Sequence, residues 1–129
     1  MTPDEYFQEI SRHIADFPFS YSFSIEFDKR SAQLAFVRGD IRFIDGSTLF
    51  FRKFIVFEPE LRRLMYSYHF QSSEGALVFR YDNAPHFPNL PNFPHHKHDK
   101  SEDHVLPSDP PDLRTVLEEI SDYFMRYFC

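Results

Sequence analysis

The residues with the greatest capacity for chemistry lie between Leu77 and His98, in the stretch LVFRYDNAPHFPNLPNFPHHKH. Its middle is interrupted by four prolines, Pro85, Pro88, Pro91 and Pro94. Proline fixes the backbone angle φ and removes an N–H group, so such a loop is stiff without a hydrogen-bond ladder. Functional residues often sit on loops held by a rigid frame. The stretch therefore predicts a site rather than a flexible linker. Its candidate polar residues are His86, His95, His96, Lys97 and His98.

The histidines at the end of this stretch allow three interpretations. As metal ligands, His96 and His98 would point the same way in an extended segment, and imidazole suits zinc. As metal-free acid–base groups, histidines with their natural pKa of about 6.5 move protons at cellular pH, while Lys97 and Arg80 hold an anion. As structural residues, they are surface side chains of a loop. Helical i, i+4 spacing and a cysteine partner are both missing, so we expect no metal and no other cofactor.

Two alternating stretches, residues 64–71 and 77–82, position the remaining candidates around a turn at residues 72–75. A one-residue slip between them would set tyrosines against charged side chains. The apolar match therefore pairs His69 with Val78 and Ser67 with Arg80. This arrangement places His69, Arg80 and Asp82 on one face of the sheet, next to the start of the proline loop.

Each of these residues also has a structural interpretation. A histidine on a strand, such as His69, is more often satisfied by a neighbour than catalytic. Arg80 and Asp82 suit cross-strand salt bridges. Arg52 and Lys53 are edge charges or phosphate contacts.

Three further strands are predicted before these two. Residues 20–28 alternate, with Tyr21, Phe23, Ile25 and Phe27 facing inward. Residues 32–44 form the next strand, whose alternation slips at Gly39 and indicates a bulge or bend there. Asp45 and Gly46 give a strong hairpin signal. Residues 49–57 are apolar on both faces apart from Arg52 and Lys53, as in a central strand that is covered on both sides.

A helix is predicted at each end of the chain. Thr2 as N-cap, Pro3 at the first helical position and Glu5 as capping-box partner start the first, which should stop near Asp16. The last helix should begin with Asp109 as N-cap and Pro110 at its first position. Extra apolar surface near its end is available to pack on the sheet or against a partner, including a second copy of the chain in a homodimer. This surface comprises Tyr123, Tyr127 and Phe128.

These elements predict one α+β domain over residues 1–129. Its order is an N-terminal helix, a five-stranded antiparallel meander, the long loop rich in proline and histidine, and a C-terminal helix packed on the sheet. Helices on one face of the sheet leave the other face for the site.

The composition excludes several function classes. A net charge of −6 and a pI near 5.6 disfavour a basic surface made for nucleic-acid backbones. Three glycines cannot form a phosphate-binding loop, and the single cysteine, Cys129, has no partner for a disulfide. Apolar runs fall short of the roughly 18 residues of a membrane span, and the start of the chain lacks signal-peptide features. We expect a cytoplasmic protein that does not enter membranes.

Four segments of the chain resemble the TumE family, toxin components of toxin–antitoxin pairs. The matching segments are Asp45-Gly46-Ser47, Tyr66-Ser67-Tyr68-His69-Phe70-Gln71, Phe79-Arg80-Tyr81-Asp82-Asn83-Ala84-Pro85-His86 and Phe93-Pro94-His95-His96-Lys97-His98. The similarity runs from about residue 34 to residue 120. The resemblance implies a small cytoplasmic toxin that is silenced by a helix-turn-helix antitoxin. It supplies no molecular target and no catalytic residues.

The first functional hypothesis is a toxin that acts as a metal-independent ribonuclease. One histidine among His69, His86, His96 and His98 takes the 2′-hydroxyl proton of RNA and another protonates the leaving oxygen. Arg80 and Lys97 stabilise the charge that develops on phosphorus, and Asp82 shares their site. The alternative is a non-catalytic protein-binding module that depends on Tyr123, Tyr127 and Phe128. A metal-bound hydrolase is a third option.

Overall fold

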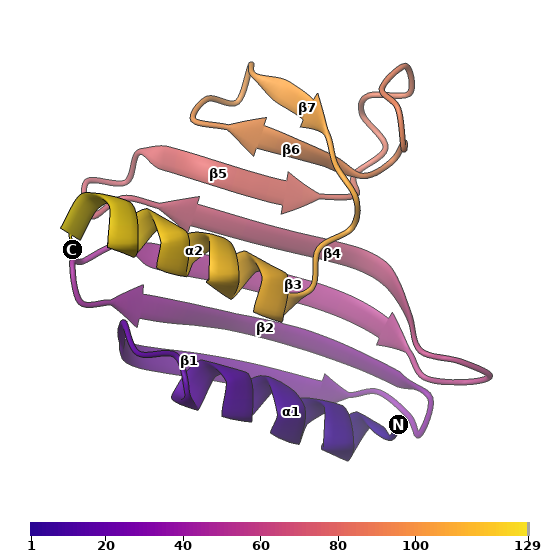
Figure 1. Ribbon diagram of the computed structural model, residues 1–129. Coiled ribbons are helices and arrows are strands. Elements are labelled where there is room, and N and C mark those ends of the chain that lie inside the picture. The colour runs from indigo at the N-terminus through magenta and orange to yellow at the C-terminus, as the bar shows by residue number, and fades with distance from the viewer. Residues whose placement is uncertain (129) are drawn as a thin grey trace.

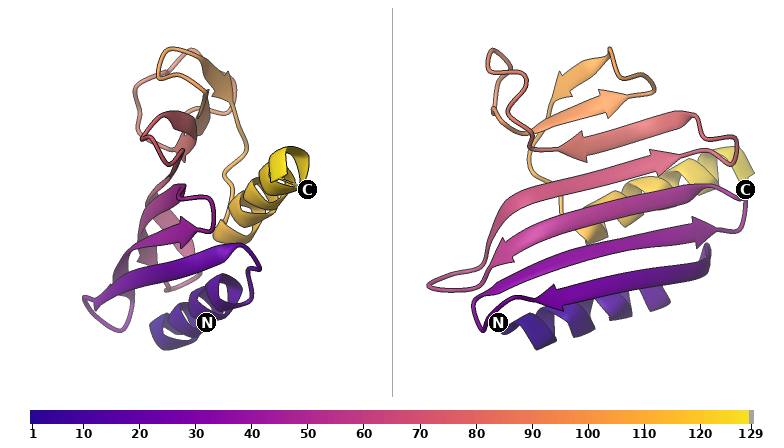
Figure 2. Two further views of the ribbon diagram at one scale, coloured as in Figure 1. Left: turned by 90° about the vertical axis from the view of Figure 1, so that its left-hand side faces the viewer. Right: turned by 180° about the vertical axis from the view of Figure 1, so that it is seen from behind.

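The fold consists of two helices on one face of an antiparallel sheet (Figure 1). The computed structural model describes residues 1–128, with side chains for residues 1–127. Helix α1 (Pro3–Ala15) and helix α2 (Leu113–Phe128) cover the same side of the sheet, and the view from behind shows the face that neither helix covers (Figure 2). We call these the covered face and the open face. The predicted α+β class and the helix at each end are confirmed.

The sheet has seven strands in chain order, not the five predicted. They are β1 (Ser20–Lys29), β2 (Leu34–Phe43), β3 (Thr48–Val56), β4 (Arg62–Gln71), β5 (Leu77–Asp82), β6 (His96–Asp99) and β7 (Val105–Pro107). The end of the predicted proline and histidine loop is therefore strand β6. Its sequence, His-Lys-His-Asp, has no apolar residue and so lacks the alternation by which strands are predicted.

The two helices differ in how well the sequence predicts their starts. At α1 the Thr2 side chain accepts from the Glu5 N–H and the Glu5 carboxylate accepts from the Thr2 N–H, so the capping box is confirmed, as is the end at Asp16. At α2 the predicted N-cap Asp109 is wrong. Asp112 accepts from the Thr115 N–H at 2.8 Å, whereas Asp109 accepts from the Asn92 side chain. The helix thus begins after both prolines, Pro110 and Pro111.

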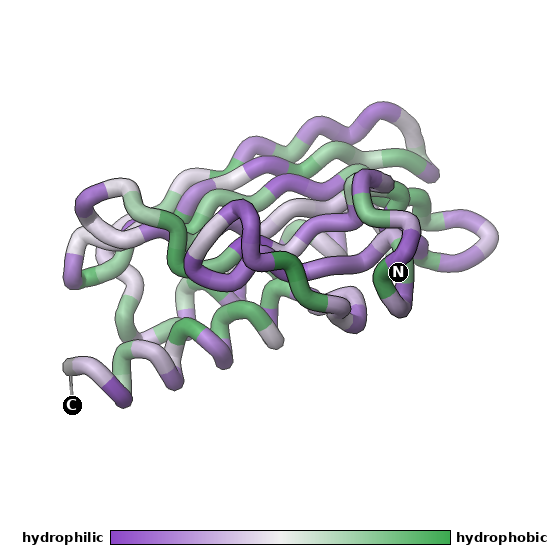
Figure 3. Tube along the Cα trace, turned by 90° about the horizontal axis from the view of Figure 1, so that it is seen from above, coloured by the Kyte–Doolittle hydropathy of each residue, from purple (hydrophilic) through white to green (hydrophobic). Residues whose placement is uncertain are grey.

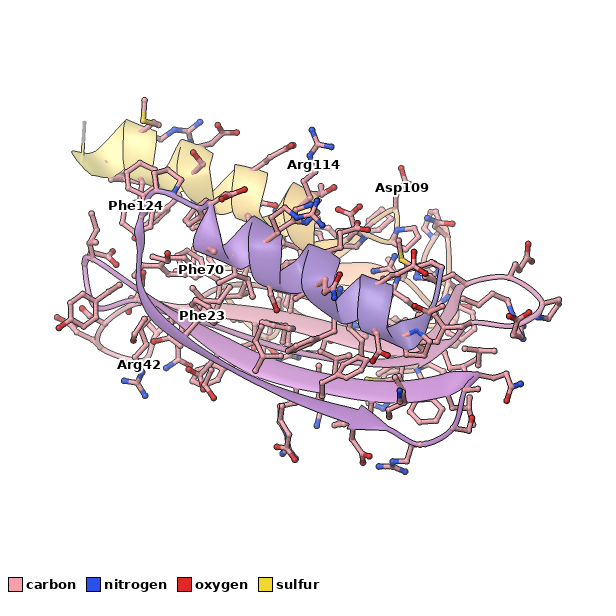
Figure 4. The ribbon with its side chains drawn as sticks, turned by 90° about the horizontal axis from the view of Figure 1, so that it is seen from below. Phe23, Arg42, Phe70, Asp109, Arg114 and Phe124 are labelled. Atoms are coloured by element: carbon pink, nitrogen blue, oxygen red, sulfur yellow. The ribbon has the colours of Figure 1, made fainter. Side chains whose placement is uncertain are left out.

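The hydrophobic core lies between the helices and the covered face. Phe124 of α2 stacks on Phe19, with ring centroids 4.8 Å apart, and also contacts Phe43. Figure 4 shows Phe70 and Phe124 in this layer and Arg42 on the far side of the sheet. Hydrophilic and hydrophobic residues alternate along the strands (Figure 3), as expected when one face packs on a core. No helix within the described residues is long and apolar enough to cross a membrane.

Strands β1 and β2 correct two predictions. Tyr21 and Phe23 are 80% and 46% exposed: Tyr21 lies at an irregularity in the pairing with β2 between Ser20 and Ser22, and β1 is an edge strand with a neighbour on one side only. At Gly39 the predicted bulge is absent, and Gly39 pairs regularly with Phe51. A Cβ atom at Gly39 would lie 2.6 Å from Cζ of Phe51, so the glycine leaves room for that ring rather than bending the strand.

Strand β3 is not covered on both sides as predicted. Phe50 is 42% exposed and Arg52 is exposed on the open face. Lys53 lies on the covered face and is 2% exposed, with its ammonium 2.8 Å from the Tyr6 hydroxyl and 5.3 Å from the centroids of the Tyr6 and Tyr68 rings. Burial lowers the pKa of Lys53 from 10.5 to about 7.

Strands β4 and β5 pair two residues away from the predicted register. His69 pairs with Arg80, and Ser67 pairs with Asp82, with an irregularity between Phe70 and Gln71 next to the turn. A shift of two residues keeps every side chain on its face, whereas a shift of one would not. The prediction that His69, Arg80 and Asp82 share a face is therefore confirmed although the register is wrong.

Candidate active site

Two neighbouring rows of side chains cross the open face from β1 to β6. The strand register gives the first row as Glu26, Arg38, Arg52, Ser67, Asp82 and His96, and the second row as Ser24, Asp40, Phe50, His69, Arg80 and His98. Residues two apart on a strand point to the same face, so the two rows lie side by side. The sheet thus brings together residues that are far apart in the sequence.

A pocket of about 1350 Å³ lies over these rows, and every residue of both rows lines it. The loop after β5 contributes further lining residues, including His86 and Phe87. Six of the seven residues named in the ribonuclease hypothesis therefore line one pocket: His69, Arg80, Asp82, His86, His96 and His98. The convergence of β4 and β5 residues with the late histidines, on which the proposed site depends, is present in the structure.

Asp82, His96 and His98 form a buried group that we call the His–Asp cluster, with exposed fractions of 9%, 2% and 4%. The Asp82 Oδ1 atom lies 2.9 Å from Nε2 of His96, and its Oδ2 atom lies 3.9 Å from Nε2 of His98. Phe87 covers the cluster, with ring centroids 4.9 Å from His96 and 5.8 Å from His98. The cluster therefore forms a buried floor of the pocket.

Arg80 links the cluster to the hairpin between β6 and β7. Its Nε donates to Asp82 at 3.1 Å, and its two terminal nitrogens hold the Glu102 carboxylate in a bidentate pair, at 2.6 Å for Nη2. This pairing raises the pKa of Arg80 and lowers the pKa of Glu102. The Glu102 side chain is 57% exposed, so its carboxylate occupies an accessible anion position on the guanidinium.

His69 and His86 are the more accessible histidines of the pocket. The His69 Nε2 atom lies 3.1 Å from Oε1 of Gln71, so Nε2 donates and Nδ1 of the neutral ring keeps its lone pair. Burial lowers the pKa of His69, which favours that neutral form. His86 is exposed on the loop over β5 and β6, next to Phe87. One accessible base and one accessible imidazole thus line the same pocket.

Lys97 is the candidate that the structure separates from the others. Because side chains alternate along β6, Lys97 points to the covered face, where its ammonium lies 2.8 Å from the Glu119 carboxylate of α2. Its ammonium also lies 5.4 Å and 5.1 Å from the ring centroids of Phe79 and Tyr81. Lys97 therefore holds β6 to helix α2 and lies on the opposite side of the sheet from the pocket.

Several pocket residues were not among the predicted site residues. Glu102 and Phe87 reach the pocket only through the packing of the hairpin and loop, for which the sequence gives no periodic signal. Arg38 and Phe50 could have been found by extending the open-face alternation of β4 back through β3 and β2. The residues of the predicted partner surface on α2 differ in exposure: Tyr123 packs on Phe70 of the sheet, whereas Tyr127 is 62% exposed. The side chain of Phe128 lies outside the described residues.

The comparison with known protein families shows which family the chain belongs to. A family model described as Toxin TumE matches residues 10–126, which is most of the chain. The chain belongs to the TumE toxin family. The family supports a toxin component of a toxin–antitoxin system, which implies an antitoxin partner. Comparisons with curated proteins and with solved structures find no match. The resemblance expected from the segments around β4, β5 and β6 is confirmed, and the match also includes the end of α1 from residue 10 onward, which the resemblance did not cover.

Proposed function

We propose that this TumE toxin arrests growth by cleaving RNA in the pocket on the open face. The observation that carries the proposal is the convergence of four histidines and Arg80 in one pocket that neither helix covers. Imidazoles exchange protons near neutral pH, and RNA carries its own nucleophile in the ribose 2′-hydroxyl. Cleavage of RNA therefore requires proton transfer and charge stabilisation but no nucleophilic side chain.

His69 and His86 are assigned to proton transfer because His96 and His98 direct their Nε2 atoms at Asp82. Nδ1 of neutral His69 takes the 2′-hydroxyl proton as that oxygen bonds to the adjacent phosphorus. The bond from phosphorus to the 5′ oxygen breaks, and protonated His86 gives its proton to the leaving oxygen. The products are a 2′,3′-cyclic phosphate and a 5′-hydroxyl, and proton exchange with water restores both histidines.

The strands before the cluster supply a binding track for the RNA chain. Arg38 and Arg52 are neighbours in the first row and offer two exposed guanidinium groups for phosphates. Phe50, which is 42% exposed beside His69 in the second row, offers a ring on which a base can stack. Arg80 stabilises the charge on the reacting phosphate when that phosphate displaces Glu102 from the guanidinium.

The test is growth arrest together with RNA cleavage by purified protein. His69→Gln and His86→Gln should each lower the cleavage rate on the order of 10²–10⁴-fold, the range for loss of a general acid or base. His13→Gln is the matched control, because His13 is a half-buried histidine on α1, which lies on the covered face and outside the pocket. It should leave cleavage unchanged. Wild-type protein that arrests growth without cleaving RNA would contradict the proposal.

A non-catalytic binding module is the second candidate, and the exposure of Tyr127 and Met125 near the end of α2 favours it. It predicts the reverse pattern of effects. Growth arrest would survive both histidine substitutions and would be lost with Tyr127→Ser.

A further inference from the structure

The His–Asp cluster contains a conflict of hydrogen-bonding roles. The Nδ1 atoms of His96 and His98 each lie 2.9 Å from a backbone carbonyl oxygen, that of Pro94 and that of Glu102 respectively. A carbonyl oxygen only accepts, so Nδ1 carries the proton in both rings. In the neutral rings, Nε2 therefore presents a lone pair to the Asp82 carboxylate. At 2.9 Å from Oδ1, the His96 Nε2 atom and Asp82 are two acceptors facing each other unless a cation lies between them.

A single proton relieves the close contact at His96 but does not engage His98. A proton on Nε2 of His96 would make an ion pair with Asp82, but Nε2 of His98 lies 3.9 Å from Oδ2, beyond hydrogen-bonding distance. Protonating both rings would bury two positive charges with ring centroids 4.9 Å apart. One cation that all three groups share relieves the close contact at His96 and also engages Nε2 of His98.

The geometry is that of a metal site. One donor atom from each of Asp82, His96 and His98 lies within 4.8 Å of the others. Ligands at about 2.0–2.2 Å from a tetrahedral metal lie about 3.3–3.6 Å from each other, so metal binding would draw the most widely separated donor atoms closer by about 1 Å. Metal-binding histidines almost always donate their other ring N–H to a carbonyl or carboxylate, as both do here. Arg80 and the Ala84 N–H orient the Asp82 oxygens in the same way, at 3.1 Å and 3.0 Å.

The charge of the pocket also favours a bound cation. Three arginines line it, Arg38, Arg52 and Arg80, against four carboxylates, Glu26, Asp40, Asp82 and Glu102. Without a cation, this balance leaves one net negative charge in the pocket that is proposed to accept RNA phosphates. A divalent cation at the His–Asp cluster would make the net charge of these groups positive.

We propose that Asp82, His96 and His98 bind one divalent transition-metal ion of the zinc class, with its remaining coordination positions directed into the pocket. Two imidazoles and one carboxylate suit Zn²⁺, Co²⁺, Mn²⁺ and Fe²⁺ and leave positions for water or a phosphate oxygen. This replaces the metal-free site predicted from the sequence. This proposal can be tested separately from the proposed RNA cleavage, because metal binding is measured without RNA.

The test is titration of the full-length chain, first treated with a chelator, with Zn²⁺ by calorimetry and with Co²⁺ by visible absorption. We expect one ion per chain. Asp82→Asn and His98→Gln should weaken binding by about tenfold or more while the far-ultraviolet circular dichroism stays unchanged. His69→Gln is the matched control, because His69 lines the same pocket without belonging to the cluster, and it should keep the stoichiometry and the affinity.

Two results would overturn the proposal. One is a folded wild-type chain that binds none of Zn²⁺, Co²⁺ and Mn²⁺. The other is binding that Asp82→Asn and His98→Gln leave unchanged, which would mean an adventitious ion only. If folding fails in either variant, His96→Gln and the double variant His96→Gln/His98→Gln, checked by the same circular dichroism, take their place. RNA cleavage that persists in chelator would remove the metal from catalysis but would leave the binding result intact.

Discussion

The two faces of the sheet give neighbouring residues opposite roles. On β3, Lys53 is buried against Tyr6 beneath the helices, whereas Arg52 is exposed over the pocket. On β6, Lys97 reaches Glu119 of α2, whereas His96 and His98, on either side of it, close the floor of the pocket. The cations of the covered face contact helices α1 and α2, and Arg52 of the open face lines the pocket. Which face a side chain occupies therefore tells more about its role than its position in the sequence.

The largest effect on stability is expected at Lys53. Since burial lowers its pKa in the folded state from 10.5 to about 7, the unfolded chain binds more protons between these pH values. Stability should therefore rise between pH 7 and pH 9, by up to about 1.4 kcal/mol per pH unit. Lys53→Met should remove this rise and stabilise the fold at pH 7 by about 1–4 kcal/mol, less the lost hydrogen bond to Tyr6. Urea unfolding at pH 7, 8 and 9 measures both effects.

The urea unfolding measurements are kept below pH 10 because tyrosines titrate above that pH. Burial raises the pKa of Tyr6 and of Tyr68 in the folded chain. These two tyrosines therefore begin to lower the stability only when the pH approaches about 10, the ordinary pKa of tyrosine. Lys97→Gln is the comparison on the same face, because the Lys97 ammonium forms an ion pair with Glu119, whereas Lys53 hydrogen-bonds to a tyrosine hydroxyl. A wild-type stability that does not change from pH 7 to pH 9 would contradict the account of Lys53.

A smaller effect is expected at Arg52, the open-face neighbour of Lys53. Arg52→Gln should change stability by less than about 0.5 kcal/mol, because the side chain is exposed. If Arg52 binds a phosphate, its loss should weaken binding of a 2′-O-methyl RNA and lower the salt slope of that binding by about 1. Fluorescence titration at several salt concentrations measures the slope.

Arg114→Gln is the matched control for Arg52→Gln. Arg114 is an exposed arginine of α2, whose helix packs on the covered face (Figure 4), and its side chain pairs only with Glu118 among the ion pairs of the described residues. Its substitution should leave the salt slope unchanged. Equal slopes for Arg52→Gln and wild type would remove the first row from the binding track.

The sequence predicts the open face better than it predicts the sheet. Alternation along β4 and β5 is enough to place His69, Arg80 and Asp82 together, and it survives a register error of two residues because side chains repeat every second residue. Strand β6 could not be predicted, because its pairing depends on contacts made by polar residues. Lys97 lies over the Phe79 and Tyr81 rings, and His96 and His98 lie under Phe87. No local pattern encodes such contacts.

The same limit explains the misplacement of Lys97 and Lys53. In a predicted loop, the sequence does not show which way each side chain points, so the prediction places Lys97 in the site together with the histidines on either side of it. A lysine in an apolar strand is expected at an edge, because buried lysines are rare unless they are paired. Only the packing of α1 and α2 shows that both lysines belong to the covered face.

Growth arrest by variants of three consecutive residues on β6 tests the central claim most directly, because His96, Lys97 and His98 differ in the face they occupy and hardly in position. Because His96 and His98 lie against Asp82, which accepts from Arg80 in the pocket, the double variant His96→Gln/His98→Gln should abolish growth arrest while it remains folded by circular dichroism. Lys97→Gln should stay as toxic as the wild type. A toxic double histidine variant, or a folded Lys97→Gln chain without toxicity, would contradict the assignment of the chemistry to the open face.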